Sequence, residues 1–190
     1  MKIERTDFKD VLLITPKSYQ DKRGDFRESF RLDKLEEFIE RKIIFCQDNL
    51  ANSKKGVIRG LHYQLDPFSQ TKLVTVIKGE VLDVIVDIRK GSPTFGKHIS
   101  IELSETNNKC VFVPRGFAHG YITLSENSIF HYKVDSYYDK GSEGSVAFDD
   151  PKLEIDWILP QSKWIVSEKD KNHSLLEDAI LFDYNTNLYD

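Results

Sequence analysis

Short apolar runs recur along the chain from residue 11 to about residue 135, and Gly, Pro, Asn and Asp residues separate them. In HISIEL (98–103) apolar and polar positions alternate, so Ile99, Ile101 and Leu103 share one face, as in a half-buried strand. The other predicted strands are VLLIT (11–15), FRESF (26–30), IIFCQ (43–47), VIRGLHYQ (57–64), KLVTVIKG (72–79), EVLDVIVDIR (80–89), CVFVP (110–114), HGYITL (119–124) and SIFHYKVD (128–135). Strands at this close spacing favour an all-β core, a jelly roll or β-barrel, over βαβ units.

Helix signals are confined to the two ends of the chain. Asp33 and Glu36 have the spacing of a capping box, and an apolar stripe follows them at Leu35, Phe38 and Ile39. Ser167 and Asp170 repeat that spacing ahead of SLLEDAILF (174–182). We therefore predict one short helix near each end of the β core.

Length and charge narrow the choice of partner. The 190 residues, with no repeat or Gly/Ser linker, predict a single domain over residues 1–190. The net charge of -4 argues against a general nucleic-acid or anionic-membrane binder. Residues 1–90 nevertheless carry a net +3 and residues 91–190 a net -7, so an anionic ligand is expected in the N-terminal half.

Cysteine usage and the N-terminus bear on the compartment. Cys46 and Cys110 lie in apolar runs, which favours buried free thiols, although a disulfide stays open. The sequence MKIERTDF has no apolar signal-peptide core, and no stretch approaches the ~18 apolar residues of a membrane span. We expect a soluble, cytoplasmic protein.

Five histidines are the first candidates for chemistry. His98 and His173 lie in polar surroundings and are interpreted as solvated, and His131 is given no role. His62 and His119 lie in strand-like segments beside glycines. Each is either a satisfied core group or a residue that lines an internal cavity.

The segment PRGFAHG (114–120) resembles the second motif of the cupins, which are jelly rolls. In metal-binding cupins the first motif supplies H-x-H and a later Glu, a ligand set suited to a divalent metal. Here the corresponding residues are His62, Tyr63 and Gln64. We therefore expect no catalytic metal and no cofactor, which leaves a cavity histidine free to accept a proton.

The chain as a whole resembles the dTDP-4-dehydrorhamnose 3,5-epimerases, a family of metal-free cupins. The resemblance rests on DKRGDFRESF (21–30), FCQDNLANSKKGVIRGLHYQ (45–64), KLVTVIKGEVLDVIVDIRKGSPTFG (72–96), VPRGFAHGYITLSE (113–126), YKVDSYYDKGSEGS (132–145) and SEKD (167–170). It implies inversion of C3 and C5 of dTDP-4-keto-6-deoxyglucose. Both carbons flank the C4 ketone, so the reaction needs a base, an acid on the opposite face, and a group that stabilises an enolate.

The resemblance assigns these roles to four residues. His62 matches the base, Asp170 the carboxylate that pairs with it, and Tyr132 the acid on the other face. Lys72 matches the cation near the C4 oxygen. From the residues alone, Asp170 could instead cap a helix with Ser167, Tyr132 could be a core residue, and Lys72 a strand-edge lysine.

Binding residues are likewise implied by the resemblance. Arg23, Arg59 and Lys169 match contacts to the diphosphate or sugar, and Tyr138 matches the ring that stacks on thymine. The remaining matched contacts are Glu28, Gln47, Asp48, Asn49, His119 and Glu143, and Asp83 is a weaker match to a supporting charge. Family members are homodimers in which N-terminal strands complete the partner's site, so Arg23 and Glu28 are expected to act in trans.

Alternatives to the double epimerase differ in their chemistry. The same acid and base would serve an epimerase that inverts only one carbon or takes another nucleotide sugar. A non-catalytic sugar-nucleotide-binding cupin needs no acid–base pair, and a metal-dependent oxygenase needs the missing H-x-H. The tail FDYNTNLYD (182–190) lies beyond the matched motifs and receives no function.

Overall fold

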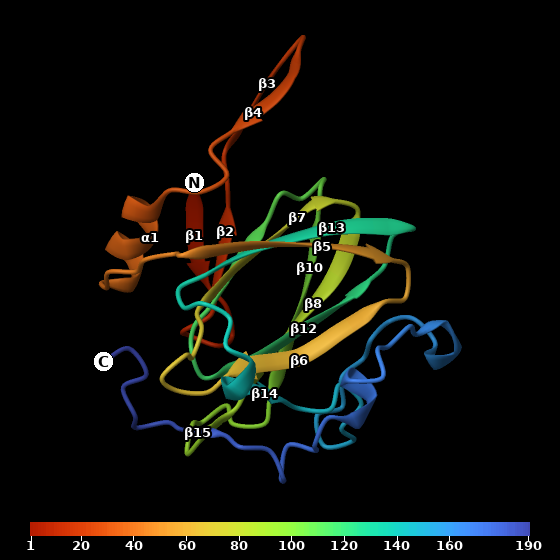
Figure 1. Ribbon diagram of the computed structural model, residues 1–190. Helices are drawn as coiled ribbons and strands as arrows, with labels where there is room; N and C mark the ends of the chain where they lie inside the picture. Colours follow the sequence, from red (N-terminus) through yellow and green to blue (C-terminus); the bar gives the residue numbers. More distant parts are fainter.

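The computed structural model describes all residues from 1 to 190 and contains two antiparallel β-sheets that face each other (Figure 1). The six-stranded sheet has the order β1 (Lys2–Arg5), β2 (Leu12–Thr15), β11 (Cys110–Val113), β7 (Lys72–Lys78), β13 (Asn127–Val134) and β5 (Gln47–Lys54). The five-stranded sheet has the order β10 (His98–Ser104), β8 (Glu80–Asp87), β12 (Phe117–Thr123), β6 (Ile58–Gln64) and β14 (Glu143–Ser145). This confirms the mainly-β, cupin-type prediction.

Two further pairs of strands lie outside these sheets. β3 (Ser18–Asp21) and β4 (Gly24–Arg27) form a hairpin that projects from the body, and β9 (Arg89–Lys90) pairs in parallel with β15 (Phe182–Asp183). The chain also forms three 3-10 turns, η1 (Lys140–Ser142), η2 (Gln161–Lys163) and η3 (Asp170–Asn172). None of the helices could span a lipid bilayer.

The N-terminal helix forms, but not through the predicted capping box. Helix α1 spans Leu32–Ile39, its N-cap is Arg31, and no side chain caps it. Asp33 lies in the first turn and pairs with Arg31 instead, while Glu36 accepts the backbone N–H of Ile43. The predicted stripe is confirmed, because Leu35 is buried and Phe38 and Ile39 pack around it.

The predicted C-terminal helix over residues 174–182 is wrong. This segment consists of turns and the short strand β15. Two backbone groups at its start pair with distant partners: Ser174 O accepts from Ala147 N, and Leu176 N donates to Asp150 Oδ2 at 2.7 Å. A nine-residue helix is marginal by itself, so these tertiary hydrogen bonds decide the conformation.

Three apolar clusters hold the two sheets together and attach the segments that cover their outer sides. Alternate residues of both sheets, among them Val74, Ile85 and Phe130, fill the space between the sheets. Helix α1 covers the outer side of the six-stranded sheet through Leu35. The C-terminal segment, blue in Figure 1, covers the outer side of the five-stranded sheet with Trp157, Leu176 and other apolar residues.

Most predicted strands lie where the pattern places them. There are two exceptions. In IIFCQ (43–47) only Gln47 is in a strand, because β5 begins there and continues through the polar sequence to Lys54. In FRESF (26–30) only Phe26 and Arg27 are in a strand, because β4 ends at Arg27. Cys46 and Cys110 are free thiols, as favoured from the sequence.

Candidate active site

A cavity of about 600 Å³ opens between the two sheets. Nine of the fourteen residues predicted for the site line it: Arg59, His62, Lys72, His119, Tyr132, Tyr138, Glu143, Lys169 and Asp170. They come from both sheets, from the loop before β14 and from the C-terminal segment. The fold therefore brings together residues that lie up to 111 positions apart, as Arg59 and Asp170 do.

A β-bulge in β6 turns both Arg59 and His62 toward this cavity. On the neighbouring strand β12, His119 is opposite His62 and Tyr121 is opposite Arg59, so β6 contains one residue more than β12 over this stretch. Gly60 lies in the bulge with φ +138°, and a Cβ there would lie 2.6 Å from the Cα of Gly120. Glycine is required at this close approach of two strands.

His62 pairs with Asp170. Their Nε2 and Oδ1 atoms lie 2.9 Å apart, and Asp170 is buried in η3. Burial alone would raise the pKa of Asp170, but the hydrogen bond with His62 and the nearby imidazoles hold this pKa below its usual value. The Ser167 hydroxyl also accepts the Asp170 N–H at 3.0 Å, so the backbone of Asp170 is capped while its side chain holds His62.

His173 lies in the same cluster, which contradicts its interpretation as solvated. Only 5% of its side chain is exposed, its Nε2 lies 3.4 Å from Asp170 Oδ1, and its ring meets that of His62 edge-on at 5.2 Å between centroids. Burial, with His62 as a second cause, lowers the pKa of His173. Its spacing of three residues from Asp170 was the one sequence signal for this contact.

His119 forms a second imidazole–carboxylate pair deeper in the cavity. Its Nε2 lies 2.8 Å from Oδ2 of Asp83, and both side chains are buried. The two readings of His119 left open by the sequence therefore both hold, because it is a satisfied buried group that also lines the cavity. The other Asp83 oxygen has no hydrogen-bond partner.

Lys72 and Tyr132 enter the cavity from the six-stranded sheet. The Lys72 ammonium donates to the carbonyl oxygen of His62 at 3.0 Å and is buried. Burial lowers the pKa of Lys72 to about 8, although the carboxylates of Asp83 and Glu143 favour its charged form. Burial also raises the pKa of Tyr132, which keeps this phenol protonated at neutral pH.

Two further residues that the sequence analysis missed hold Arg59 in place. The Arg59 Nε donates to the Ser53 hydroxyl at 3.1 Å, and that hydroxyl lies 3.1 Å from the hydroxyl of Tyr121. Tyr121 also stacks on Phe130 with centroids 4.1 Å apart. A serine and a tyrosine within alternating strand sequence gave no sign of this contact.

The outer part of the cavity is polar and exposed. Lys169 pairs with Glu143 at 2.5 Å, and the Tyr138 ring, 56% exposed, lies beside the same carboxylate. Gln47 accepts the backbone N–H of Tyr138 at 3.1 Å and so fixes the chain at this point.

Five predicted residues do not line the cavity of this chain. Gln47 and Asn49 lie on β5, with Asn49 opposite Tyr132, whereas Asp48 binds Lys133 on the other face of the sheet. Arg23 is at the tip of the β3–β4 hairpin and pairs with Asp21, and Glu28 follows the hairpin and pairs with Arg31. Asp48 thus faces away from the side of the sheet that Gln47 and Asn49 share, because successive strand residues face opposite sides.

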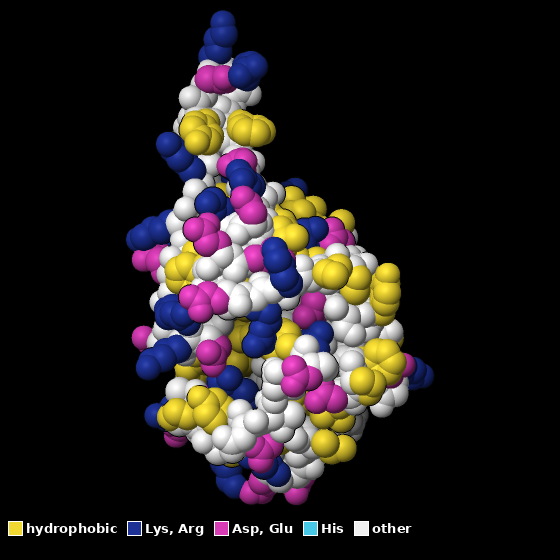
Figure 2. Space-filling view, turned by 90° about the vertical axis from the view of Figure 1, so that its left-hand side faces the viewer, with side chains coloured by type: hydrophobic (Ala, Val, Ile, Leu, Met, Phe, Trp, Pro, Cys, Tyr) yellow, Lys and Arg dark blue, Asp and Glu magenta, His cyan; other side chains and the backbone are white.

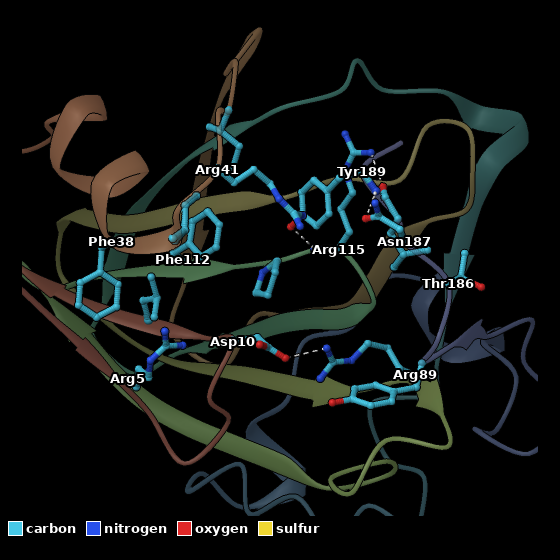
Figure 3. Close-up of a pocket in the computed structure, with 16 residues that line it drawn as sticks. Arg5, Asp10, Phe38, Arg41, Arg89, Phe112, Arg115, Thr186, Asn187 and Tyr189 are labelled. Carbon is cyan, nitrogen blue, oxygen red and sulfur yellow. Dashed lines mark hydrogen bonds and ion pairs between the residues drawn. The ribbon is translucent and has the colours of Figure 1, made fainter.

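A second cavity, of about 540 Å³, lies between α1, the six-stranded sheet and the C-terminal tail (Figure 3). None of the predicted site residues lines it. The tail is anchored there by Tyr189, whose hydroxyl lies 3.0 Å from Thr71 Oγ1 and whose ring packs under the guanidinium of Arg41. The tail thus closes one end of the fold.

Comparison with known proteins identifies the family of the chain. The sequence model of the dTDP-4-dehydrorhamnose 3,5-epimerase family matches residues 5–178. A dTDP-4-dehydrorhamnose 3,5-epimerase of Shigella flexneri is 45% identical over 182 residues, which are 96% of this chain and 99% of that protein. The crystal structure of dTDP-6-deoxy-D-glucose-3,5-epimerase from Legionella pneumophila Philadelphia 1, in complex with dTDP-4-keto-L-rhamnose, is 44% identical with a TM-score of 0.92, and the match covers 97% of this chain and 99% of that chain.

A protein named for a single inversion is also similar, but less so. The dTDP-4-dehydrorhamnose 3-epimerase of Streptomyces niveus is 35% identical over 179 residues, which cover 94% of this chain and 86% of that protein. The identity to the double epimerase of Shigella flexneri is higher, at 45%. The chain therefore belongs to the dTDP-4-dehydrorhamnose 3,5-epimerase family and is an isomerase of that activity.

Proposed function

We propose that the cavity between the sheets inverts C3 and C5 of dTDP-4-keto-6-deoxy-D-glucose to give dTDP-4-keto-L-rhamnose, with His62 as base and Tyr132 as acid. This assignment rests on the positions of the two residues. His62 is on β6 of one sheet and Tyr132 is on β13 of the other, and both line the cavity. A sugar ring held between the sheets would meet the base on one face and the acid on the other. Inversion requires that arrangement.

The His62–Asp170 pair removes the proton from the sugar. With its Nε2–H donated to Asp170, the neutral imidazole keeps its lone pair on Nδ1, which accepts the proton from C3 or C5. The Asp170 carboxylate stabilises the imidazolium that results. The electron pair of the broken C–H bond moves to the C4 oxygen, and the buried Lys72 ammonium stabilises this enolate oxygen.

Reprotonation completes each inversion. The Tyr132 hydroxyl delivers its proton to the same carbon from the opposite face, and the enolate returns to the ketone. His119, held by Asp83, is placed to bind a sugar hydroxyl within the same cavity.

The nucleotide occupies the outer part of the cavity. Arg59 and Lys169 supply positive charge for the diphosphate, and the exposed Tyr138 ring supplies a stacking surface for thymine. Gln47 supports Tyr138 by its hydrogen bond, and Asn49 lies on the same strand as Gln47.

The active unit is a homodimer in this proposal. The β3–β4 hairpin projects from the molecule and carries exposed hydrophobic side chains (Figure 2). Its cross-strand pair Tyr19 and Phe26 is 53% and 69% exposed. An isolated two-stranded hairpin is marginal in water, so it needs a surface to pack against. Packing on a second copy would bury this pair and would carry Arg23 and Glu28 toward the partner's cavity, since they are remote from their own.

The cytoplasm is the proposed location. Both cysteines are free thiols, which agrees with a reducing compartment.

Deuterium exchange tests the reaction directly. The protein is incubated with dTDP-4-keto-6-deoxyglucose in D2O, and deuterium at C3 and C5 is followed by NMR. Exchange at both carbons with formation of the rhamno product is expected, and exchange at C3 or C5 alone would select the single-inversion alternative. Binding of the substrate without exchange at either carbon would replace the enzyme by a non-catalytic binding protein.

A further inference from the structure

We propose that His62, Asp170 and His173 form a binding site for a zinc-type divalent cation, and that occupation of this site inhibits the enzyme. Binding depends on the three side chains alone, whereas inhibition rests on the role proposed for His62. The cation is not a cofactor here, because it would occupy the nitrogen through which the base is oriented.

The spacing of the donor atoms suits a tetrahedral ion. The Asp170 Oδ1 lies 2.9 Å from His62 Nε2 and 3.4 Å from His173 Nε2. All three ligand atoms lie within 4.8 Å of one another. Zinc binds such atoms at about 2.0–2.2 Å, which places neighbouring tetrahedral ligands roughly 3.3 Å apart. Only small side-chain movements separate the present arrangement from a zinc site.

His173 provides an independent sign of a missing ligand. Its side chain is 5% exposed, and neither ring nitrogen has a hydrogen-bond partner. Buried polar groups are nearly always satisfied, so an imidazole left in this state requires an explanation. A cation held between His173 and Asp170 would satisfy its Nε2.

The cavity gives a cation access to His62 and Asp170 and leaves room for a fourth ligand. His62 and Asp170 line the cavity, and 31% of the His62 side chain is exposed, so a hydrated ion can enter and keep one water. The ammonium groups of Lys72 and Lys169 oppose a cation, although Lys169 is paired with Glu143. Imidazole and carboxylate donors in this number favour zinc and cobalt over magnesium or calcium.

Inhibition is expected because the cation would bind one ring nitrogen of His62 and thereby change the protonation of the other. A neutral imidazole has a single proton and a single free lone pair. When the cation takes the lone pair at Nε2, the proton resides on Nδ1, and His62 can no longer accept a proton from the sugar. The ion also removes Asp170 from its pairing with His62.

Metal titration of the chelator-treated full chain tests the site. Zn²⁺ binding is measured by calorimetry and Co²⁺ binding by visible absorption, whose intensity reports tetrahedral coordination. One ion per chain is expected. His173→Gln should weaken binding at least roughly tenfold, while His173→Cys, which restores a zinc ligand, should bind. His98→Gln, which alters a histidine outside the cluster on β10, is the matched control and should bind as the unmodified chain does.

The outcomes separate binding from inhibition. Absence of saturable Zn²⁺ and Co²⁺ binding by the unmodified chain would overturn the site, whatever the variants do, and so would equal affinity in His173→Gln. Binding of one ion with activity unchanged would leave the site in place and remove the inhibitory role. Because calorimetry and absorption do not depend on turnover, they also stand if the proposed reaction fails in the deuterium test.

Discussion

The Nε2 of His62 lies 2.9 Å from the Oδ1 of Asp170, although the two residues are 108 positions apart in the chain. One lies on a strand of the five-stranded sheet, and the other lies in a 3-10 turn of the segment that covers this sheet. A neutral His62 hydrogen-bonded in this way has a fixed ring orientation and a fixed tautomer. Asp170 thereby determines which nitrogen can act as the base.

Asp170→Asn should slow proton removal by about 10²- to 10⁴-fold, by analogy with the orienting carboxylate of hydrolase triads. The amide has the same shape but lacks the charge that stabilises the imidazolium. Single-turnover deuterium exchange at C3 measures the effect. Affinity for dTDP is the control and should stay unchanged; exchange at the normal rate would show that His62 works without Asp170.

Tyr132→Phe should impair formation of the inverted product more than it impairs deuterium exchange. The ring and its packing against Phe130 remain, but no proton is delivered from the six-stranded sheet. Product formation and exchange are compared in one NMR experiment in D2O. Equal loss of both would count against an acid on the opposite face.

Activity should fall as the pH rises through about 8, because the pKa of Lys72 is lowered to about 8 and a neutral amine stabilises an enolate poorly. The stability effect has the opposite sign. Between the folded pKa of about 8 and the ordinary value of 10.5, the unfolded chain binds more protons at this residue. The contribution of Lys72 to the free energy of unfolding therefore rises with pH across that window.

The pH profile of kcat/KM of chelator-treated enzyme checks the activity, and denaturant unfolding of the enzyme and of Lys72→Met checks the stability. In Lys72→Met the rise in stability over this window should be absent. A profile that stays flat to pH 10 would mean that Lys72 is not needed in its charged form.

Tyr138→Ala should raise the Kd for dTDP by about 5- to 150-fold, the equivalent of roughly 1–3 kcal/mol of base stacking. Tyr137→Ala is the matched control, since Tyr137 is similarly exposed at 66% but does not line the cavity. Calorimetric titration with dTDP measures both variants. Similar losses in the two would place the base elsewhere.

Phe26→Glu should give a monomer in place of the proposed dimer, because it puts a charge into the surface that the hairpin would bury against a second copy. Ile180→Glu, at another exposed apolar position, is the control and should leave the mass unchanged. Light scattering after size-exclusion chromatography measures the mass.

A subunit-mixing experiment tests whether Arg23 acts in the partner's cavity. Subunits carrying Arg23→Ala and subunits carrying His62→Ala are mixed after reversible unfolding. The mixture should regain activity that neither variant has alone, because one cavity of the mixed dimer then receives both residues. No recovery in verified mixed dimers would place Arg23 outside the partner's site.

Alternating patterns predicted the strands of the core well, because one inward face and one outward face impose a period of two residues. HISIEL is the clearest case, and β10 covers it with one further residue. The pattern failed where tertiary contacts override local preference. Residues 174–182 have a helical pattern, but Ser174 and Leu176 form hydrogen bonds with Ala147 and Asp150 instead of extending a helix.

The sequence motifs predicted part of the candidate site. The motifs select nine residues that line one cavity. Strict alternation would place Arg59 and His62, three residues apart, on opposite faces, and only the bulge in β6 brings them together. His173 was misread because local sequence does not report burial by a distant strand, and Arg23 cannot be placed within one chain because its expected contact lies in another.

The order of elements along the chain has a consequence for synthesis. A nascent chain that has emerged as far as Ser145 contains all strands of the two large sheets, including the bulge, Lys72 and Tyr132. It still lacks Asp170 and the apolar cover of the five-stranded sheet. The strands of both sheets are therefore available for pairing before Asp170 has been synthesised. Orientation of His62 by Asp170 requires the C-terminal segment to fold back onto the apolar outer face of the five-stranded sheet.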